Sequence, residues 1–254
     1  MMYKGYLIDL DGTMFNGTEV IDGAVNFIDR LNESGIPYLF LTNNATRHPD
    51  EILQKFETMG FQTTVNHIYT SAAAMKSYLE QEFKAPSVYL VGTESFKNSL
   101  TEDGGVVISN TSPDAVVMGL DTSITFDKII TACRLIQEGA RFLATNPDIK
   151  IKTDFGFSPG NGSFVKLVSE VTGVEPVITG KPNRYILDGA LARLNLLPGE
   201  AVMIGDNYDT DILTGINGGM DTIHVGTGVH SKEEVMNKEV PPTHVIDRLY
   251  DWQL

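Results

Sequence analysis

The chain has 254 residues, which at roughly 150 residues per domain corresponds to one or two domains. Its composition is ordinary for a globular protein, with 42% hydrophobic and 20% charged residues, and no stretch approaches the roughly 18 consecutive apolar residues of a membrane span. These features exclude intrinsically disordered, collagen-like and membrane-spanning proteins. The formal net charge of −14 also disfavours nucleic acid and anionic membranes as partners, because both are negatively charged. A phosphate-bearing ligand would have to be held by local cations or backbone N–H groups.

The one cysteine, Cys133, forbids an internal disulfide, and the chain reaches Asp9 and Asp11 without an apolar signal region. We therefore expect a cytoplasmic protein. Cys133 shares an apolar stripe with Ile129 and Ile136, which places it in the predicted core.

Short apolar runs alternate along the chain with segments of helical periodicity. The first run, residues 6–8, precedes a helix that begins at Ala24 and closes at Gly35, and the second, residues 38–41, precedes a helix that begins at Pro49. We predict further strands over residues 88–91, 106–108, 116–118, 142–144, 149–151 and 201–204, and further helices over residues 71–83, 126–137, 164–171 and 185–194.

This alternation predicts an α/β fold, with a Rossmann-like, mainly parallel sheet and helices on both of its faces. Ligands of such sheets bind beyond the carboxyl ends of the strands, so polar residues that follow apolar runs are the candidate site residues. Two segments, residues 85–87 and 180–182, are candidate crossing points between domains.

Two carboxylates, Asp9 and Asp11, stand at the end of the first predicted strand and should point to the same side of it. Two anions so close need a cation between them, or one of them keeps its proton. One can then attack as a nucleophile while the other serves as general acid and base. The alternatives are a plain acidic turn and a calcium loop. The calcium loop fails, because Met14 and Val20 occupy the positions that would need glycine and glutamate.

Two weaker signals follow. Thr42, Asn43 and Asn44 follow the second predicted strand and offer groups that suit phosphate oxygens, although the same residues are common in plain loops. The local sequence Gly180-Lys181-Pro182, taken alone, favours an exposed Lys181 in a turn.

The last strong apolar run ends in Asp206, with Asp209 and Asp211 just beyond it. Asp206 is placed to join Asp9 in holding a hard cation through oxygen. Asp209 is predicted to cap the helix that follows. Asp211 either carries a charge in the first turn of that helix or, as we favour, supports the metal shell.

Taken in order, Asp-x-Asp-Gly-Thr at 9–13, Thr-Asn-Asn at 42–44, Gly-Lys-Pro at 180–182 and Gly-Asp-x4-Asp at 205–211 resemble the motifs of the haloacid dehalogenase superfamily of aspartyl-nucleophile phosphatases. The resemblance covers the chain from end to end. The long segment between the second and third motifs resembles the type C2 cap of the NagD and p-nitrophenylphosphatase branch. Two local patches carry that resemblance, residues 144–148 and 158–163.

The resemblance implies a role for each matching residue. Asp9 would be the nucleophile that forms an aspartyl phosphate, and Asp11 the general acid and then the base. Thr42, Asn43 and Lys181 would bind the transferring phosphoryl group. The Asp9 and Asp206 carboxylates and the Asp11 backbone carbonyl would hold Mg²⁺, with Asp211 behind them, and Mn²⁺ fits these oxygen ligands about equally well.

The resemblance also implies two domains, a core of residues 1–80 and 180–254 and a cap of residues 81–179. In the cap, Asn146 and Asp148 either face the substrate or only turn the chain. Gly160 to Ser163 either aim N–H groups at a substrate or form a plain helix start, and Arg47 either contacts a substrate anion or is solvated.

We therefore expect a Mg²⁺-dependent phosphatase for small phosphorylated metabolites, such as nucleoside monophosphates or sugar phosphates, with neither nucleic acid nor membrane as partner. No oligomeric state is predicted. The alternatives are a phosphoacceptor signalling module, a phosphotransferase on the same core, and a non-catalytic binding protein.

Overall fold

The computed structural model describes residues 3–153 and 155–254. They form two compact units. The first comprises the chain up to Thr42, Pro49–Tyr69 and Lys181–Leu254, and the second comprises Asn43–His48 and Thr70–Gly180.

The first unit is built on a six-stranded sheet in the order β15-β14-β13-β1-β4-β5. Its paired strands run parallel, with Ile8 of β1 opposite Ile204 of β13 on one side and Phe40 of β4 on the other. The carboxyl ends of β1, β4 and β13 therefore lie next to one another. The strands are β1 (Gly5–Ile8), β4 (Tyr38–Thr42), β5 (Ile68–Thr70), β13 (Ala201–Gly205), β14 (Asp221–Val225) and β15 (His244–Ile246).

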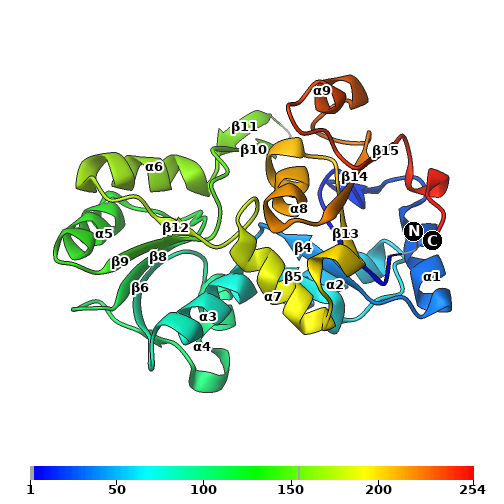
Figure 1. The fold of residues 1–254 in the computed structure, drawn as a ribbon. Coiled ribbons are helices and arrows are strands. Elements are labelled where there is room, and N and C mark those ends of the chain that lie inside the picture. Colours follow the sequence, from blue (N-terminus) through cyan, green and yellow to red (C-terminus); the bar gives the residue numbers. More distant parts are fainter. Residues whose placement is uncertain (1–2, 154) are drawn as a thin grey trace. The chain divides into compact units, whose positions relative to one another are not determined.

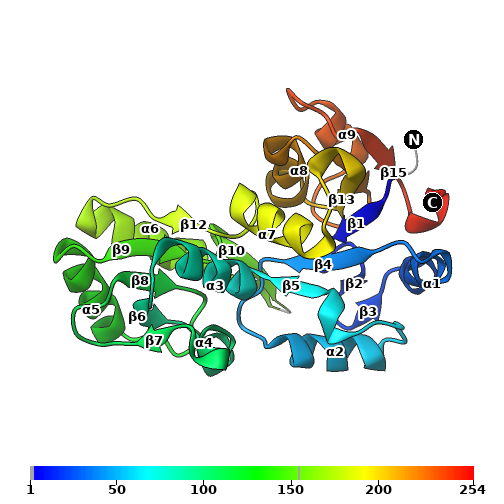
Figure 2. The same ribbon diagram turned by 60° about the horizontal axis from the view of Figure 1, so that its bottom comes forward.

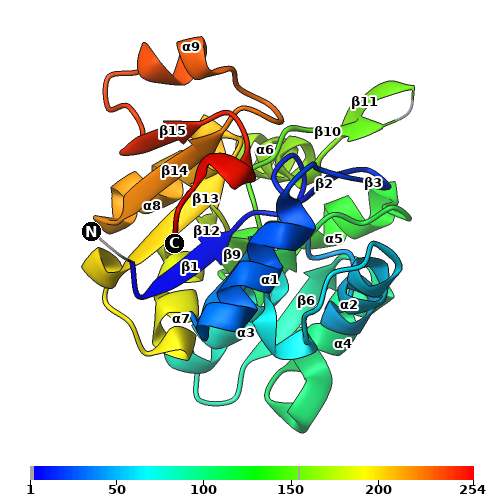
Figure 3. The same ribbon diagram turned by 90° about the vertical axis from the view of Figure 1, so that its right-hand side faces the viewer.

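Helices cover both faces of this sheet. On one face lie α1 (Ala24–Ser34), which crosses β1 in Figure 3, and α2 (Pro49–Thr58). On the other lie α7 (Arg184–Leu194) and α8 (Leu213–Gly218), so that α2 and α7 flank β4 and β5 from opposite sides in Figure 2. Because side chains alternate along a strand, Tyr6 and Ile8 of β1 enter the core cluster that includes Phe27 of α1, while Leu7 faces the opposite way.

The second unit has its own five-stranded parallel sheet, in the order β12-β9-β8-β6-β7. In Figure 1, α3 and α4 lie on one face and α5 and α6 on the other. Val88 and Val117 pack in the cluster beneath α3 and α4, and Tyr89 and Val116 in the cluster beneath α5 and α6. The elements are β6 (Ser87–Val91), β7 (Val107–Ile108), β8 (Ala115–Met118), β9 (Arg141–Ala144), β12 (Val177–Ile178), α3 (Ser71–Glu82), α4 (Glu94–Thr101), α5 (Phe126–Gln137) and α6 (Asn161–Thr172).

Smaller elements connect these layers. Two antiparallel hairpins pair β2 (Phe15–Asn16) with β3 (Glu19–Val20), and β10 (Lys150–Thr153) with β11 (Gly156–Pro159). The remaining helices are α9 (Lys232–Met236), η1 (Val65–His67), η2 (Glu102–Gly104), η3 (Pro198–Glu200), η4 (Tyr208–Ile212) and η5 (Leu249–Asp251). Within residues 3–153 and 155–254, every helix falls short of the length and apolar character that a membrane-crossing helix requires.

The predicted α/β class and parallel sheets are confirmed, with differences in detail. Residues 43–48, 70–80 and 180, expected in the first domain, group with the second unit. Ala45, Met75 and Leu79 are buried in the cluster that contains Val88. The predicted strand at 149–151 lies outside the five-stranded sheet, and β10 pairs with β11 in a separate two-stranded sheet. Of the two candidate crossing points, 180–182 contains a change of unit, whereas 85–87 lies inside the second unit.

Candidate active site

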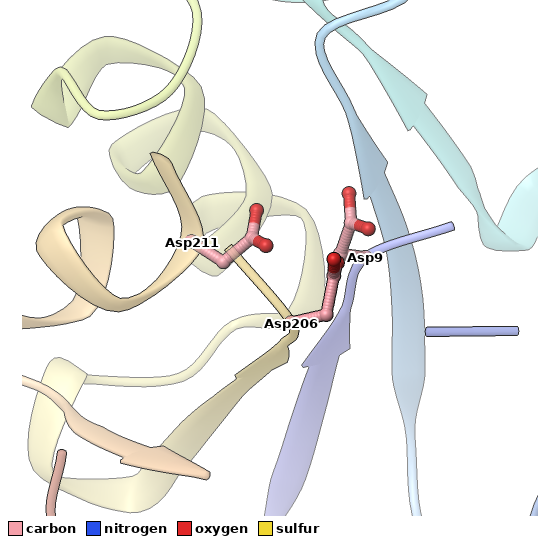
Figure 4. Close-up of side chains that lie close together, drawn as sticks. All are labelled: Asp9, Asp206 and Asp211. Atoms are coloured by element: carbon pink, nitrogen blue, oxygen red, sulfur yellow. The ribbon is translucent and has the colours of Figure 1, made fainter. Parts of the chain in front are cut away.

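Three aspartates converge at the carboxyl ends of β1 and β13 in the first unit. Asp9 directly follows β1, Asp206 follows β13, and Asp211 lies in η4 just beyond it. One carboxylate oxygen of each lies within 4.8 Å of the corresponding oxygens of the other two. Figure 4 shows the three side chains close together. All three residues are buried. Because β1 and β13 are parallel neighbours, the sheet itself brings residues 9 and 206 together.

Lys181 supplies a positive charge at the same place. Its Nζ donates to Asp9 Oδ1 at 2.5 Å, to Asp211 Oδ1 at 2.7 Å and to the backbone carbonyl of Leu41 at 2.9 Å. Only 2% of the residue is exposed, so the prediction of an exposed turn lysine, drawn from its local sequence alone, is wrong. Burial disfavours the charged form, but the carboxylates of Asp211 and Asp9 outweigh burial and raise the pKa of Lys181 above its usual value.

Asp206 is held by groups from two loops and from strand β14. Thr13 Oγ1 donates to its Oδ1 at 3.3 Å, the N–H of Val229 donates to its Oδ2 at 2.6 Å, and Nε2 of His224 lies 3.0 Å from its backbone oxygen. The backbone at Gly228 lies close to the Asp206 carboxylate, since a Cβ added at Gly228 would lie 1.9 Å from Asp206 Oδ2. Burial, together with the charge of Asp211, raises the pKa of Asp206 to about 6.

Asp211 faces the lysine and the loop that carries it. Besides Lys181, its carboxylate accepts the N–H of Asn207 at 3.1 Å and the hydroxyl of Thr210 at 3.2 Å. The predicted helix cap at Asp209 is wrong, because the side chain of Asn207 accepts the N–H of Asp209 at 3.0 Å and serves as the cap. Asp209 instead lies on the surface, with its carboxylate 3.5 Å from Nζ of Lys238.

The cluster holds three carboxylates and one lysine, so ionised acids outnumber the cation. Burial, reinforced by the charges of Asp211 and Asp206, raises the pKa of Asp9 well above its usual range, and Lys181 only partly opposes this. A divalent cation beside Asp9 and Asp206 would remove the imbalance. Carboxylate oxygens are the ligands that such hard cations prefer.

The other predicted residues of the catalytic motifs occupy the same strand ends. Asp11 is exposed and lies in the turn between β1 and the β2–β3 hairpin, where the N–H of Gly12 donates to Phe15 at 2.8 Å. Thr42 is the last residue of β4 and is buried. Asn43, one residue on, begins the segment that packs with the second unit.

Within the second unit, the predicted cap residues lie against Asn43. Asn146 Nδ2 donates to the backbone carbonyl of Asn43 at 3.0 Å, and Asn43 Nδ2 donates to Asp148 Oδ2 at 3.3 Å. Asn44 Oδ1 accepts a hydrogen bond from the hydroxyl of Thr46 at 2.7 Å, which is consistent with a structural role for Asn44 in this loop. Gly160 is the N-cap of α6, and Ser163 Oγ donates to the carbonyl of Ile149.

Several residues of the site were not predicted. His224 belongs to β14, which comes after the last strand predicted from the sequence. Gly228 and Val229 follow β14. The run Gly226-Thr227-Gly228, directly behind the apolar residues of β14, was the signal for another strand end at this edge.

Comparisons with known proteins show the family of this chain. Residues 6–105 match the model of the haloacid dehalogenase-like hydrolase family, and residues 178–252 match a HAD-hydrolase-like model. An acid sugar phosphatase of Staphylococcus saprophyticus is 46% identical over 247 residues, which cover 97% of this chain and 95% of that protein. The chain belongs to the haloacid dehalogenase-like hydrolases.

Further relatives of this hydrolase are phosphatases too. An acid sugar phosphatase of Staphylococcus aureus is 47% identical over 242 residues, covering 95% of this chain and 93% of that protein. The structure of NagD from Escherichia coli superposes with a TM-score of 0.94 at 29% identity, covering 100% and 99% of the two chains. A thermostable NPPase from Geobacillus stearothermophilus gives a TM-score of 0.93 at 39% identity, covering 99% of each chain. The predicted resemblance is confirmed, and this haloacid dehalogenase-like hydrolase is a phosphatase.

Proposed function

We propose that this phosphatase hydrolyses small phosphate monoesters in a Mg²⁺-dependent reaction, with Asp9 as the nucleophile. The observation that carries the proposal is the buried Asp9 carboxylate, 2.5 Å from Nζ of Lys181 and within 4.8 Å of a carboxylate oxygen of Asp206. The substrate class is that of phosphorylated metabolites, with sugar phosphates first, because the named relatives include acid sugar phosphatases. The cytoplasm remains the proposed compartment, on the ground of the single, buried Cys133.

The donor set fits a hard divalent cation. The carboxylates of Asp9 and Asp206, with the backbone carbonyl of Asp11, would hold Mg²⁺, and Mn²⁺ fits the same donors. Support comes from the raised pKa values of both acids, since buried carboxylates that lack enough positive charge hold protons more tightly. When bound, the cation neutralises charge on the phosphoryl oxygens and so favours attack by an anion.

In the first step, an Asp9 oxygen attacks phosphorus, forms the aspartyl phosphate and releases the alcohol of the ester. Asp11 donates a proton to the leaving oxygen as the phosphorus–oxygen bond breaks. Lys181 favours the ionised form of Asp9 and holds its carboxylate in place through the contact at 2.5 Å. Thr42 and Asn43 supply hydrogen bonds to the phosphoryl oxygens.

In the second step, Asp11, now ionised, takes a proton from a water molecule that attacks the phosphorus of the aspartyl phosphate. The phosphorus–Asp9 bond breaks, and inorganic phosphate and the free carboxylate result. Asp211 takes no part in bond making, because its carboxylate is occupied by Lys181, Asn207 and Thr210. It keeps the lysine charged and oriented through both steps.

We further propose that the second unit, which includes all of residues 81–179, serves as the type C2 cap that excludes water and selects the leaving group. Phosphate transfer to an acceptor other than water is the alternative reaction, and a stable phosphoprotein is the alternative outcome.

The deciding experiment measures phosphate release from a panel of phosphorylated sugars, nucleotides and p-nitrophenyl phosphate, with and without Mg²⁺. We expect Mg²⁺-stimulated release from several esters by the wild-type protein. No release from any ester would refute hydrolysis. Release of the alcohol without inorganic phosphate would favour transfer to another acceptor, or a persistent phosphoprotein.

A further inference from the structure

The backbone carbonyl of Asn43 accepts two hydrogen bonds from side chains of the second unit. Ser71 Oγ donates at 2.7 Å, and Asn146 Nδ2 donates at 3.0 Å. The side chain of Asn43 is held as well, since its Nδ2 donates to Asp148 Oδ2 at 3.3 Å. Asn43 is therefore fixed by the second unit, although Thr42 before it ends a strand of the first.

These contacts set which way the Asn43 amide points. An ionised carboxylate only accepts hydrogen bonds, so the nitrogen of the amide must face Asp148. The oxygen faces the backbone at Gly180, where an added Cβ would lie 2.6 Å from Asn43 Oδ1. The amide is thus held between a carboxylate and a residue without a side chain, and this limits its rotation.

The residues that hold Asn43 are themselves anchored. Asn146 Oδ1 accepts the N–H of Asp148 at 3.2 Å. Behind them, Asn161 is 1% exposed, and its Nδ2 donates to the carbonyls of Asn146 at 3.1 Å and Met118 at 3.2 Å. The two patches of sequence around residues 146 and 161 therefore form one hydrogen-bonded support beneath Asn43.

We propose that Asn146 and Asp148 are positioning residues that fix the conformation of Asn43, and do not select the leaving group. The inference rests on the proposed function, in which Asn43 binds the transferred phosphoryl group. That group is common to every substrate, so a displaced Asn43 impairs all substrates by a similar factor. Loss of a contact to the leaving group would instead impair some substrates and spare others.

Three variants separate these roles. Asn146→Asp keeps the size of the side chain and the oxygen that accepts from Asp148, but loses the donor to the carbonyl of Asn43. Asp148→Ala removes the acceptor for the Asn43 amide, whereas Asp148→Asn keeps an acceptor there. Each is compared with wild type for kcat/KM on p-nitrophenyl phosphate and on a sugar phosphate, and for inhibition by inorganic phosphate.

We expect Asn146→Asp and Asp148→Ala to lower kcat/KM by about 10- to 100-fold on both substrates, because small displacements of a binding group have effects of this size. Both should also weaken inhibition by inorganic phosphate, which has no leaving group. Asp148→Asn should stay within about threefold of wild type, since it retains a hydrogen bond to Asn43.

The matched control is Asp121→Asn. Asp121 is a buried acid of the same unit whose Oδ2 accepts from Nζ of Lys128 at 2.6 Å. This variant should lower the melting temperature and leave the kcat/KM of the folded enzyme unchanged. Losses confined to one substrate, with unchanged phosphate inhibition, would overturn the inference, and so would losses that appear equally in Asp121→Asn. A wild-type protein without turnover would refute the proposed function. Losses confined to one substrate, in an active wild-type background, would refute only the inference about Asn146 and Asp148.

Discussion

The Nζ of Lys181 lies 2.5 Å from Oδ1 of Asp9, although 172 positions separate the two residues in the chain. The same Nζ lies 2.7 Å from Asp211, so one buried cation joins the proposed nucleophile to an acid that follows β13. Removal of the lysine would leave both of these acids buried without their cation.

Replacing Lys181 by methionine should destabilise the first unit. Asp9 and Asp211 would remain buried without their partner, and an uncompensated buried charge typically costs about 3–5 kcal/mol. The free energy of unfolding from urea denaturation measures the loss. Lys4→Met removes a lysine that is paired with Glu200 on the surface, and it should leave stability nearly unchanged. Equal stability of Lys181→Met and wild type would show that the buried pair is not important for the fold.

Replacing Asp11 by asparagine should slow turnover according to the leaving group. An ester whose alcohol is a poor leaving group needs the proton from Asp11, whereas p-nitrophenolate leaves without one. We expect a loss of about 100- to 10,000-fold in kcat on a sugar phosphate and a smaller loss in formation of the aspartyl phosphate from p-nitrophenyl phosphate. Stopped-flow measurement of p-nitrophenol release resolves this first step. Equal losses on both esters would contradict the assignment of Asp11 as general acid.

Replacing Gly228 by alanine should weaken Mg²⁺ binding. The new Cβ would lie 1.9 Å from Oδ2 of Asp206 and would displace the carboxylate from its position. We expect Mg²⁺ affinity to fall by about tenfold or more, in line with the effect of disturbing the surroundings of a metal ligand. Gly226→Ala is the matched control, because its nearest neighbour is a backbone oxygen 3.9 Å away. Equal Mg²⁺ affinity in both variants would argue against Asp206 as a ligand.

Mg²⁺ affinity should rise with pH. The pKa of Asp206 in the folded, metal-free protein is raised from 3.8 to about 6, so folding favours its protonated form. The stability linked to this group is present below its unfolded pKa and is lost as the pH rises through about 6. Mg²⁺ must displace the proton of Asp206, so its apparent affinity should be lower at pH 5 than at pH 7. If one proton is displaced, the affinity falls by about tenfold for each pH unit below the pKa. Calorimetric titration in buffers of different ionisation enthalpy measures both affinity and proton release, and an affinity independent of pH would contradict this coupling.

Much of the fold could be predicted from the sequence because its signals are local. The buried strand at 6–8 and the helix closed by Gly35 follow from apolar runs and a stop residue within a dozen positions. The meeting of Asp9 and Asp206 could be predicted as well, since both end apolar strands of a parallel sheet. The β2–β3 hairpin was missed although Asn16-Gly17 is a turn signal, because its strands have only two residues each.

What could not be predicted depends on partners far along the chain. The local sequence of Lys181 is that of an exposed turn, and its burial follows from three acceptors, one just after β1, one on β4 and one in η4. The packing of Asn43 with the second unit depends in the same way on Ser71 and Asn146. Neither contact leaves a pattern within a window of neighbouring residues.

Trapping the phosphorylated enzyme tests whether Asp9 attacks phosphorus. Wild-type protein is mixed with p-nitrophenyl phosphate and Mg²⁺, quenched in acid during turnover, digested and analysed by peptide mass spectrometry, with Asp9→Asn and Asp209→Asn treated in parallel. We predict one added phosphoryl group on Asp9 in wild type and in Asp209→Asn, and neither label nor turnover in Asp9→Asn. A label on another residue, or undiminished turnover by Asp9→Asn, would contradict the proposed chemistry.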